Sequence, residues 1–158
     1  MKTTLSVAKL DKTFGAVVEG LKLSNLSESQ PKEIYKLWLE HSLLIFPNQN
    51  LTKDEQVKFA KLFGQMEFDI PPISNVKQDG SIRDPVDDDI VKSLRGNMEW
   101  HHDSTYMPIQ AKGSVFTAHQ VPPEGGETGW ADMTAAYEAL DPKMKEKIKD
   151  LCAYNSYS

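Results

Sequence analysis

The sequence lacks several features that define whole classes of protein. Its 158 residues include a single cysteine, Cys152, so no internal disulfide can form, and this agrees with a reducing cytoplasm. No apolar run approaches the roughly 20 residues that a membrane span needs. The N-terminus also has no continuous hydrophobic core of the secretory-signal type. We therefore expect a cytoplasmic protein without a membrane partner.

Positive charge is also in deficit. The chain has 18 Lys and Arg residues against 23 Asp and Glu residues, which gives a formal net charge of −5. Nucleic-acid binding needs clustered Lys and Arg, so no nucleic-acid partner is expected. The hydrophobic content of 39% and the charged content of 26% are ordinary for globular proteins, which excludes global disorder. At this length, residues 1–158 are expected to form one domain.

Short strands and helices alternate in the first part of the chain. Apolar and β-branched residues predict strands at 4–9, 14–22 and 42–46. The capping boxes Ser27-x-x-Gln30 and Thr52-x-x-Glu55 predict the starts of two helices, each with an apolar stripe that we interpret as core.

Residues 65–99 are rich in proline, glycine and acidic residues, which predicts a long loop with one strand at 73–76. Long ordered loops are often lids or binding loops, and disorder is the alternative. The run Asp87-Asp88-Asp89 is interpreted as a solvated turn, because no spaced set of oxygen ligands surrounds it.

Further on, the sequence predicts a strand at 113–121 and two more helices. Asp132 is expected to cap a helix that runs through Leu140, and Asp141-Pro142 is expected to start the next helix.

The stretch Trp100-His101-His102-Asp103 carries the most chemistry. In an extended backbone, His101 and Asp103 point to the same side and His102 points away. An imidazole and a carboxylate at this spacing can bind one metal ion. With a further histidine they would form the facial triad of non-haem Fe(II) oxygenases. The H-x-D pattern alone is common by chance, so an exposed polar loop is the alternative.

The wider context resembles a known family. WHHDSTY, followed by AKGSVFTAHQVPPEGGETGWADMTAAYEALDP, strongly resembles the taurine and 2,4-dichlorophenoxyacetate dioxygenase family, which depends on Fe(II) and 2-oxoglutarate. FGAVVEGLKL, LLIFPNQNLT and KLFGQ have family-like counterparts as well, so the resemblance covers essentially the whole chain. It implies an α+β fold with a double-stranded β-helix (jelly-roll) core and flanking helices. It also implies hydroxylation of a small, anionic organic substrate by dioxygen, with release of succinate and carbon dioxide.

The resemblance also implies roles for single residues. His101 and Asp103 match the first two iron ligands, and Thr128 matches a threonine whose hydroxyl contacts a carboxylate of 2-oxoglutarate. Asn97 and Tyr106 match positions close to the substrate. Structural alternatives remain for three of them: Thr128 starts a strand after a turn, Asn97 satisfies loop backbone, and Tyr106 belongs to the core.

The chain also departs from the family pattern. Glu67-Phe68-Asp69 stands where taurine-type members place a sulfonate-binding histidine, so a taurine-like substrate is not expected. No histidine follows His119 and no arginine follows Arg95, although the family has a distal iron-ligand histidine and a distal arginine for 2-oxoglutarate.

We therefore expect the N-terminal portion of a dioxygenase domain, with an incomplete jelly-roll. A degenerate, non-catalytic relative that binds a small molecule or a partner is the alternative. Homo-oligomers are common in the family, but nothing in this sequence specifies one.

Overall fold

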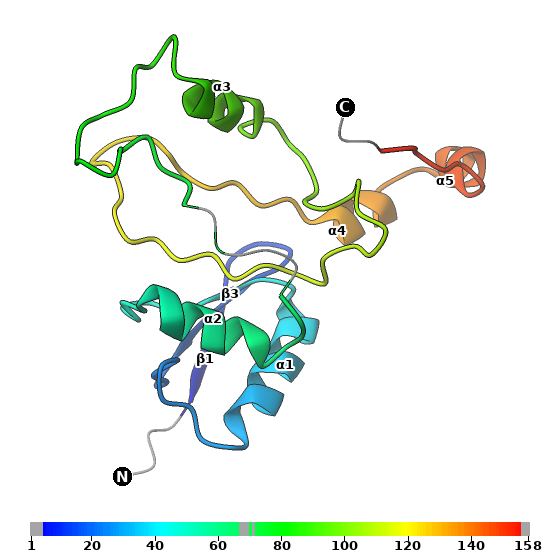
Figure 1. The fold of residues 1–158 in the computed structure, drawn as a ribbon. Helices are drawn as coiled ribbons and strands as arrows, with labels where there is room; N and C mark the ends of the chain where they lie inside the picture. The colour runs from blue at the N-terminus through cyan, green and yellow to red at the C-terminus, as the bar shows by residue number, and fades with distance from the viewer. Residues whose placement is uncertain (1–4, 67–69, 71, 156–158) are drawn as a thin grey trace. The chain divides into compact units, whose positions relative to one another are not determined.

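A computed structural model describes residues 5–66, 70 and 72–155, which fall into two compact units (Figure 1). The first unit comprises residues 1–66 and 115–153, and the second comprises residues 67–114 and 154–158. Each unit is considered by itself below, and the single-domain expectation stays a prediction. Within the described residues, no helix has both the length and the apolar character required to cross a membrane.

The first unit is built on a three-stranded sheet. β1 (Ser6–Lys9) pairs antiparallel with β2 (Ala16–Glu19), and β3 (Leu44–Ile45) runs parallel to β2. Because β2 is the central strand, its residues Ala16 and Val18 are completely buried. All three strands predicted for this region are confirmed, but each is shorter than predicted.

Two helices adjoin the sheet strands in the chain: one lies between β2 and β3, and the other follows β3. α1 (Gln30–His41) starts after Ser29, so the predicted start at Ser27 is wrong. Pro31 lies in its first turn, where the fixed φ of proline and its missing N–H favour a helix start. The Gln30 side chain still accepts a hydrogen bond from the Ser27 N–H at 2.7 Å, so half of the predicted capping box is present.

α2 (Lys53–Lys61) starts as the sequence predicts. The Thr52 side chain accepts from the Glu55 N–H, and the Glu55 carboxylate accepts from the Thr52 N–H at 2.8 Å. The hydrogen bond from the Thr52 N–H, and after it the one that the same carboxylate accepts from the Thr52 hydroxyl at 2.9 Å, lower the pKa of the Glu55 carboxyl. The complete capping box fixes where α2 begins.

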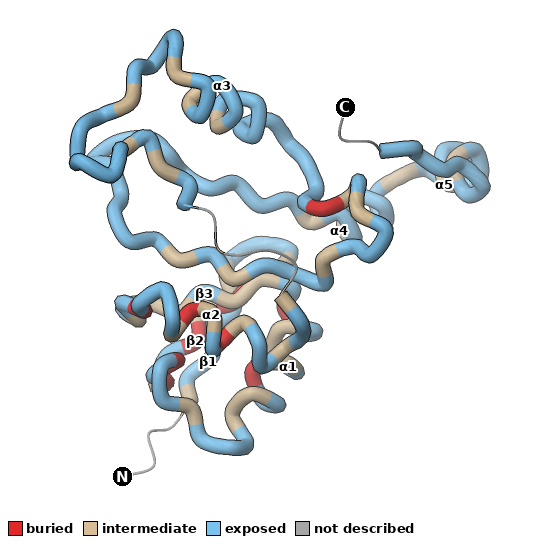
Figure 2. The backbone as a smooth tube through the Cα atoms, viewed as in Figure 1, coloured by how far each residue is buried: buried red, intermediate tan, exposed pale blue. Residues whose placement is uncertain are grey.

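The core of the first unit lies between the sheet and these two helices, and Figure 2 shows its buried residues in red. Ile34 of α1 and Phe59 of α2 are 3% and 5% exposed, which confirms that both apolar stripes face the core. Phe59 packs edge-on against Phe46 and Phe63, with ring centroids 6.1 and 5.2 Å apart. The core cluster consists of Val18, Leu21, Leu23, Ile34, Leu51 and Phe59.

The strand predicted at 113–121 is wrong. No segment among the described residues forms a ladder with it, and a strand exists only where a neighbour supplies hydrogen bonds. The two helices that follow are confirmed. α4 (Met133–Glu138) begins after Asp132 and ends two residues before Leu140, and α5 (Pro142–Ile148) begins after Asp141.

The second unit contains a helix that the sequence analysis missed. α3 (Asp89–Gly96) lies within the predicted loop 65–99, and a single bridge between Val76 and Ile82 stands where a strand was predicted at 73–76. The loop prediction failed because proline and acidic residues outweighed the cap of Asp88 and the apolar spacing after it. Residues 67–69, which hold the departure from the taurine-type pattern, lie outside the described residues.

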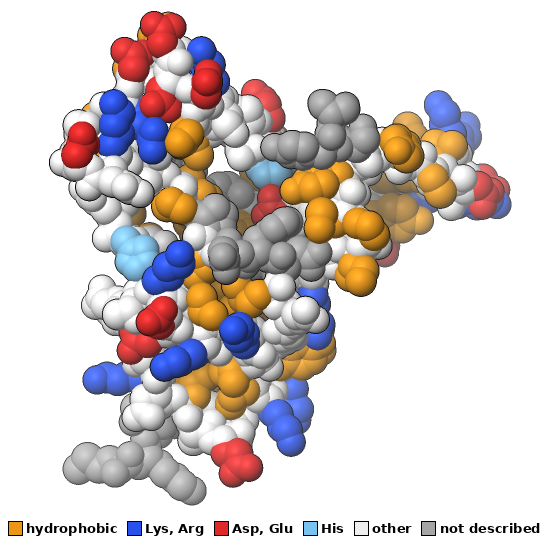
Figure 3. Space-filling view, in the orientation of Figure 1, with side chains coloured by type: hydrophobic (Ala, Val, Ile, Leu, Met, Phe, Trp, Pro, Cys, Tyr) orange, Lys and Arg blue, Asp and Glu red, His pale blue; other side chains and the backbone are white. Residues whose placement is uncertain are grey.

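Large apolar side chains remain exposed in both units (Figure 3). Exposed examples in the first unit are Phe116, Val121, Trp130 and Met133, and examples in the second are Ile73, Val86, Trp100 and Ile109.

The described residues form one small sheet with flanking helices, which is α+β but is not by itself a jelly-roll.

Candidate functional site

The side chains of His101 and Asp103 meet in the second unit. The Nε2 atom of His101 lies 3.1 Å from Oδ1 of Asp103, and the two side chains are 49% and 71% exposed. The pair lies in irregular backbone rather than in a strand. The two side chains therefore lie on the same side, as expected, although neither residue belongs to a strand.

The other ring nitrogen of His101 is also engaged, because Nδ1 lies 2.7 Å from the carbonyl oxygen of Glu99. A carbonyl and a carboxylate only accept hydrogen bonds, so both ring nitrogens face acceptors. Two arrangements satisfy them: an imidazolium that donates twice, or a neutral ring that donates from Nδ1 while a cation lies between Nε2 and the carboxylate. The second is the arrangement that metal-bound histidines usually show.

The distance between the two candidate ligand atoms fits a metal ion. Ligands at about 2.1 Å on adjacent corners of an octahedron lie about 3.0 Å apart. The observed 3.1 Å between Nε2 and Oδ1 matches that edge. The His102 side chain makes a different contact, because its Nδ1 lies 2.8 Å from the carbonyl oxygen of Asp103. Across residues 5–66, 70 and 72–155, no group of three or more His, Cys, Asp and Glu side chains is arranged to hold a metal.

A sharp turn follows Asp103 that the sequence analysis did not anticipate. Ser104 has a φ of 61° and is only 7% exposed, and its carbonyl accepts from the N–H of Met107 at 3.1 Å. The turn therefore changes the direction of the backbone directly after Asp103. A serine carries no sequence signal for a left-handed conformation, so this position had to be found in the structure.

Asn97 and Tyr106 belong to the same unit as the pair. Asn97 caps the C-terminal end of α3, and its N–H donates to the Ser93 carbonyl at 3.2 Å. Any residue at this position would donate the same backbone N–H, so both the substrate role of Asn97 and the alternative in which its side chain satisfies loop backbone stay predictions. Tyr106 is 41% exposed, so it does not belong to a core.

Thr128 belongs to the first unit, and the structure does not relate it to the histidine and the aspartate. It is exposed and follows a tight turn in which Gly125 and Gly126 have φ values of 73° and 74°. A Cβ at Gly126 would lie 3.2 Å from Cγ of Pro122, so both the conformation and the space favour glycine there. The role of Thr128 in binding 2-oxoglutarate stays a prediction.

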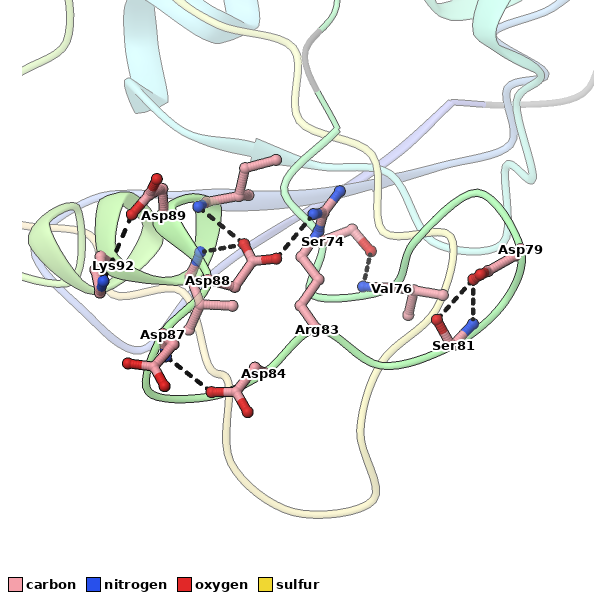
Figure 4. A network of polar contacts seen from close by, with 12 residues as sticks. Ser74, Val76, Asp79, Ser81, Arg83, Asp84, Asp87, Asp88, Asp89 and Lys92 are labelled. Atoms are coloured by element: carbon pink, nitrogen blue, oxygen red, sulfur yellow. Dashed lines mark hydrogen bonds and ion pairs between the residues drawn. The ribbon is translucent and has the colours of Figure 1, made fainter.

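A polar network supports α3, the helix that precedes Asn97 (Figure 4). Oδ1 of Asp88 accepts from the N–H groups of Ile90 and Val91, and Oδ2 lies 3.2 Å from Nη1 of Arg83. Asp88 is only 17% exposed, so its interpretation as part of a solvated turn is wrong. The network ties the turn region of residues 74–83 to the start of α3.

These contacts set the charge state of Asp88. Burial raises the pKa of this carboxyl, but the hydrogen bonds from Arg83 and from the amides of Val91 and Ile90 outweigh burial, so the pKa lies below its usual value. A lowered pKa in the folded state means that the unfolded chain binds more protons. The contribution of Asp88 is therefore fully present above about pH 3.9 and is lost as the pH falls through the folded pKa.

We expect Asp88→Ala to loosen α3, because it removes both the cap and the ion pair. Amide exchange of Ile90 and Val91 should speed up about five- to tenfold at pH 7. In the unmodified chain, the same loosening should set in on acidification below about pH 3.9. Asp89→Ala is the matched control, since the Asp89 side chain is 96% exposed and forms an ion pair with Lys92 at 3.5 Å on the surface. Equal effects of the two substitutions would contradict this role of Asp88.

A family model and the curated relatives of this chain agree with one another. The family model described as "Taurine catabolism dioxygenase TauD, TfdA family" matches residues 6–158. An (S)-phenoxypropionate/alpha-ketoglutarate-dioxygenase of Sphingobium herbicidovorans is 52% identical over 157 residues, covering 99% of this chain and 55% of the relative. An alpha-ketoglutarate-dependent 2,4-dichlorophenoxyacetate dioxygenase of Cupriavidus pinatubonensis is 33% identical over 156 residues, covering 89% of this chain and 54% of that relative.

Solved structures agree with these matches. The crystal structure of AAD-2 in complex with Mn(II) and N-oxalylglycine superposes with a TM-score of 0.83 at 35% identity. The superposition covers 93% of this chain and 54% of AAD-2. The chain thus spans about half the length of the relatives that it matches.

Proposed function

Because this chain belongs to the TauD, TfdA family, with a match over residues 6–158, we propose that it forms part of an Fe(II)- and 2-oxoglutarate-dependent dioxygenase. The observation that carries the proposal is the 3.1 Å approach of His101 Nε2 to Asp103 Oδ1, with His101 Nδ1 held by a carbonyl. The relatives described above have catalytic names, which supports an enzyme over the non-catalytic alternative.

The proposed substrate is a small phenoxy carboxylate. This narrows the expectation of a small anionic molecule, and it is supported by the 52% identity to the phenoxypropionate dioxygenase. The proposed cosubstrates are 2-oxoglutarate and dioxygen. N-oxalylglycine, which accompanies Mn(II) in AAD-2, differs from 2-oxoglutarate by an NH group in place of a CH₂ group.

Each predicted residue has a task in this proposal. His101 and Asp103 hold Fe(II), which when bound supplies the oxidising chemistry that hydroxylates the substrate and converts 2-oxoglutarate to succinate and carbon dioxide. The carbonyl of Glu99 fixes the imidazole so that Nε2 carries the lone pair. The Thr128 hydroxyl donates to a carboxylate of 2-oxoglutarate, and Asn97 and Tyr106 lie beside the substrate.

We assign the remaining parts of the site to the part of the relatives' sequences that this chain does not match. The resemblance implies a distal histidine as third ligand and a distal arginine for the far carboxylate of 2-oxoglutarate. We assign the rest of the jelly-roll core to the same part, and we take residues 1–158 as one portion of a single domain. The exposed Cys152 thiol fits the proposed cytoplasmic location.

A chimera tests the proposal. In it, this chain replaces the matched 157 residues of the Sphingobium herbicidovorans relative. With Fe(II) and 2-oxoglutarate, the chimera should release succinate in proportion to added (S)-phenoxypropionate. The His101→Ala chimera should lose this coupled release, and the His102→Ala chimera should keep it. A folded chimera whose succinate release equals that of its His101→Ala variant would overturn the proposal.

A further inference from the structure

Ser104 holds a backbone conformation that is uncommon for its residue type. Among the described residues, the non-glycine residues with a positive φ are Ser42, Asn48, Asn50 and Ser104. Asparagine tolerates left-handed backbone well, and Ser42 closes the C-terminal end of α1, where a positive φ is common. Neither explanation applies to Ser104, which has a φ of 61° and lies outside any helix. Such a conformation persists only where the surrounding structure imposes it.

Ser104 is also closely packed within its unit. With 7% exposure it is the single buried residue among the described residues of the second unit. Its carbonyl accepts a hydrogen bond from the Met107 N–H at 3.1 Å, which closes the turn. Both features oppose a change of φ at Ser104, because such a change would break the hydrogen bond and move a buried residue against its neighbours. The surrounding structure thus imposes the left-handed turn.

The place of this turn in the chain determines what it does. Ser104 directly follows Asp103, whose Oδ1 lies 3.1 Å from Nε2 of His101. Neither residue of the pair belongs to a strand, so no sheet sets the direction in which their side chains point. The Asp103 side chain is 71% exposed, so packing does not hold its carboxylate in place. The turn at the next residue is left to fix the direction of the carboxylate.

We propose that Ser104 is a positioning residue whose left-handed backbone holds the Asp103 carboxylate against the His101 imidazole. The inference rests on the proposed function in taking this pair as metal ligands. A pair that is already in place loses less conformational freedom when a divalent ion binds, so the turn increases the metal affinity. The role belongs to the backbone. It therefore requires a side chain that allows a positive φ, and it does not require the hydroxyl.

Three substitutions separate the backbone of Ser104 from its hydroxyl. Ser104→Thr keeps the hydroxyl, but its β-branch disfavours a positive φ. Ser104→Ala removes the hydroxyl and keeps an unbranched Cβ, and Ser104→Gly adopts left-handed backbone freely. Titration with Mn(II), monitored by electron paramagnetic resonance, should show about tenfold weaker binding for Ser104→Thr. Ser104→Ala and Ser104→Gly should bind Mn(II) as the unmodified chain does.

A second measurement uses the metal-free chain, so its result does not depend on the proposed function. In the unmodified chain, a nuclear Overhauser effect should connect the His101 ring protons with the Asp103 β protons. Ser104→Thr should lose this effect, and Ser104→Ala and Ser104→Gly should keep it. Ser93→Thr makes the same change in the helical backbone of α3 and should alter neither measurement. Absence of Mn(II) binding in the unmodified chain would count against the proposed metal pair, and the nuclear Overhauser effect would still decide the role of Ser104.

Amide exchange of Ile90 and Val91 in α3 shows whether the second unit stays folded in each variant. A folded Ser104→Thr variant that keeps the contact would overturn the proposal, and so would one that loses the contact but retains undiminished Mn(II) binding. Equal losses in Ser104→Ala would also overturn it, because the hydroxyl would then carry the role. If Ser104→Thr does not fold, Ser104→Gly decides. It should keep the contact and the Mn(II) affinity at least as well as Ser104→Ala, and a weaker result would overturn the proposal.

Discussion

His101→Ala and Asp103→Ala should each weaken the binding of a divalent metal ion to this chain by about ten- to a hundredfold or more. Each substitution removes one of the two atoms that face each other at 3.1 Å, Nε2 or Oδ1. The remaining atom would have to hold the ion without its chelating neighbour. Titration with Mn(II) or Co(II), monitored by calorimetry or by electron paramagnetic resonance of the ion, measures the ratio of the metal affinities directly.

His102→Ala is the matched control for this titration. His102 is adjacent in sequence and has the same side chain, but its Nδ1 faces the carbonyl of Asp103 rather than the carboxylate. The control should bind metal as the unmodified chain does. Equal losses in all three variants would show that the effect comes from the loop in general, and no loss in the first two would place the ligands elsewhere.

Phe59→Ala should lower the free energy of unfolding by about 3–5 kcal/mol. The Phe59 side chain is 5% exposed, belongs to the core cluster, and packs edge-on against both Phe46 and Phe63. Its removal loses the burial of a ring and leaves a cavity that the neighbouring strands and helices cannot fill. Urea denaturation followed by circular dichroism measures the change.

Leu62→Ala serves as the control, because Leu62 follows α2 directly and is 51% exposed. Its substitution should change the free energy of unfolding by less than about 1 kcal/mol. A Phe59→Ala variant as stable as Leu62→Ala would mean that the cluster around Phe59 does not hold this unit together.

Features set by neighbouring residues could be predicted from the sequence. Thr52, Asp132 and Asp141 cap their helices as expected, because a capping bond joins residues only two or three positions apart. Asp88 caps α3 in the same way, so that helix was predictable, but the surrounding acidic and proline residues favoured a loop interpretation.

Features that depend on distant partners could not be predicted. The segment 113–121 has the composition of a strand, yet pairing requires a neighbour that no local pattern can supply. The meeting of His101 with Asp103 was predictable because the two residues are only two positions apart. The contact of His101 Nδ1 with the Glu99 carbonyl was not, because any residue has a carbonyl and only the loop conformation selects this one.

Localised paramagnetic broadening tests the central claim most directly. Mn(II) added to the isotopically labelled 158-residue chain should broaden the resonances of His101 and Asp103 first, and His101→Ala should abolish the effect. Broadening centred instead on the acidic run Asp87-Asp88-Asp89, or broadening that persists in His101→Ala, would contradict the assignment of His101 and Asp103 as the metal-binding pair.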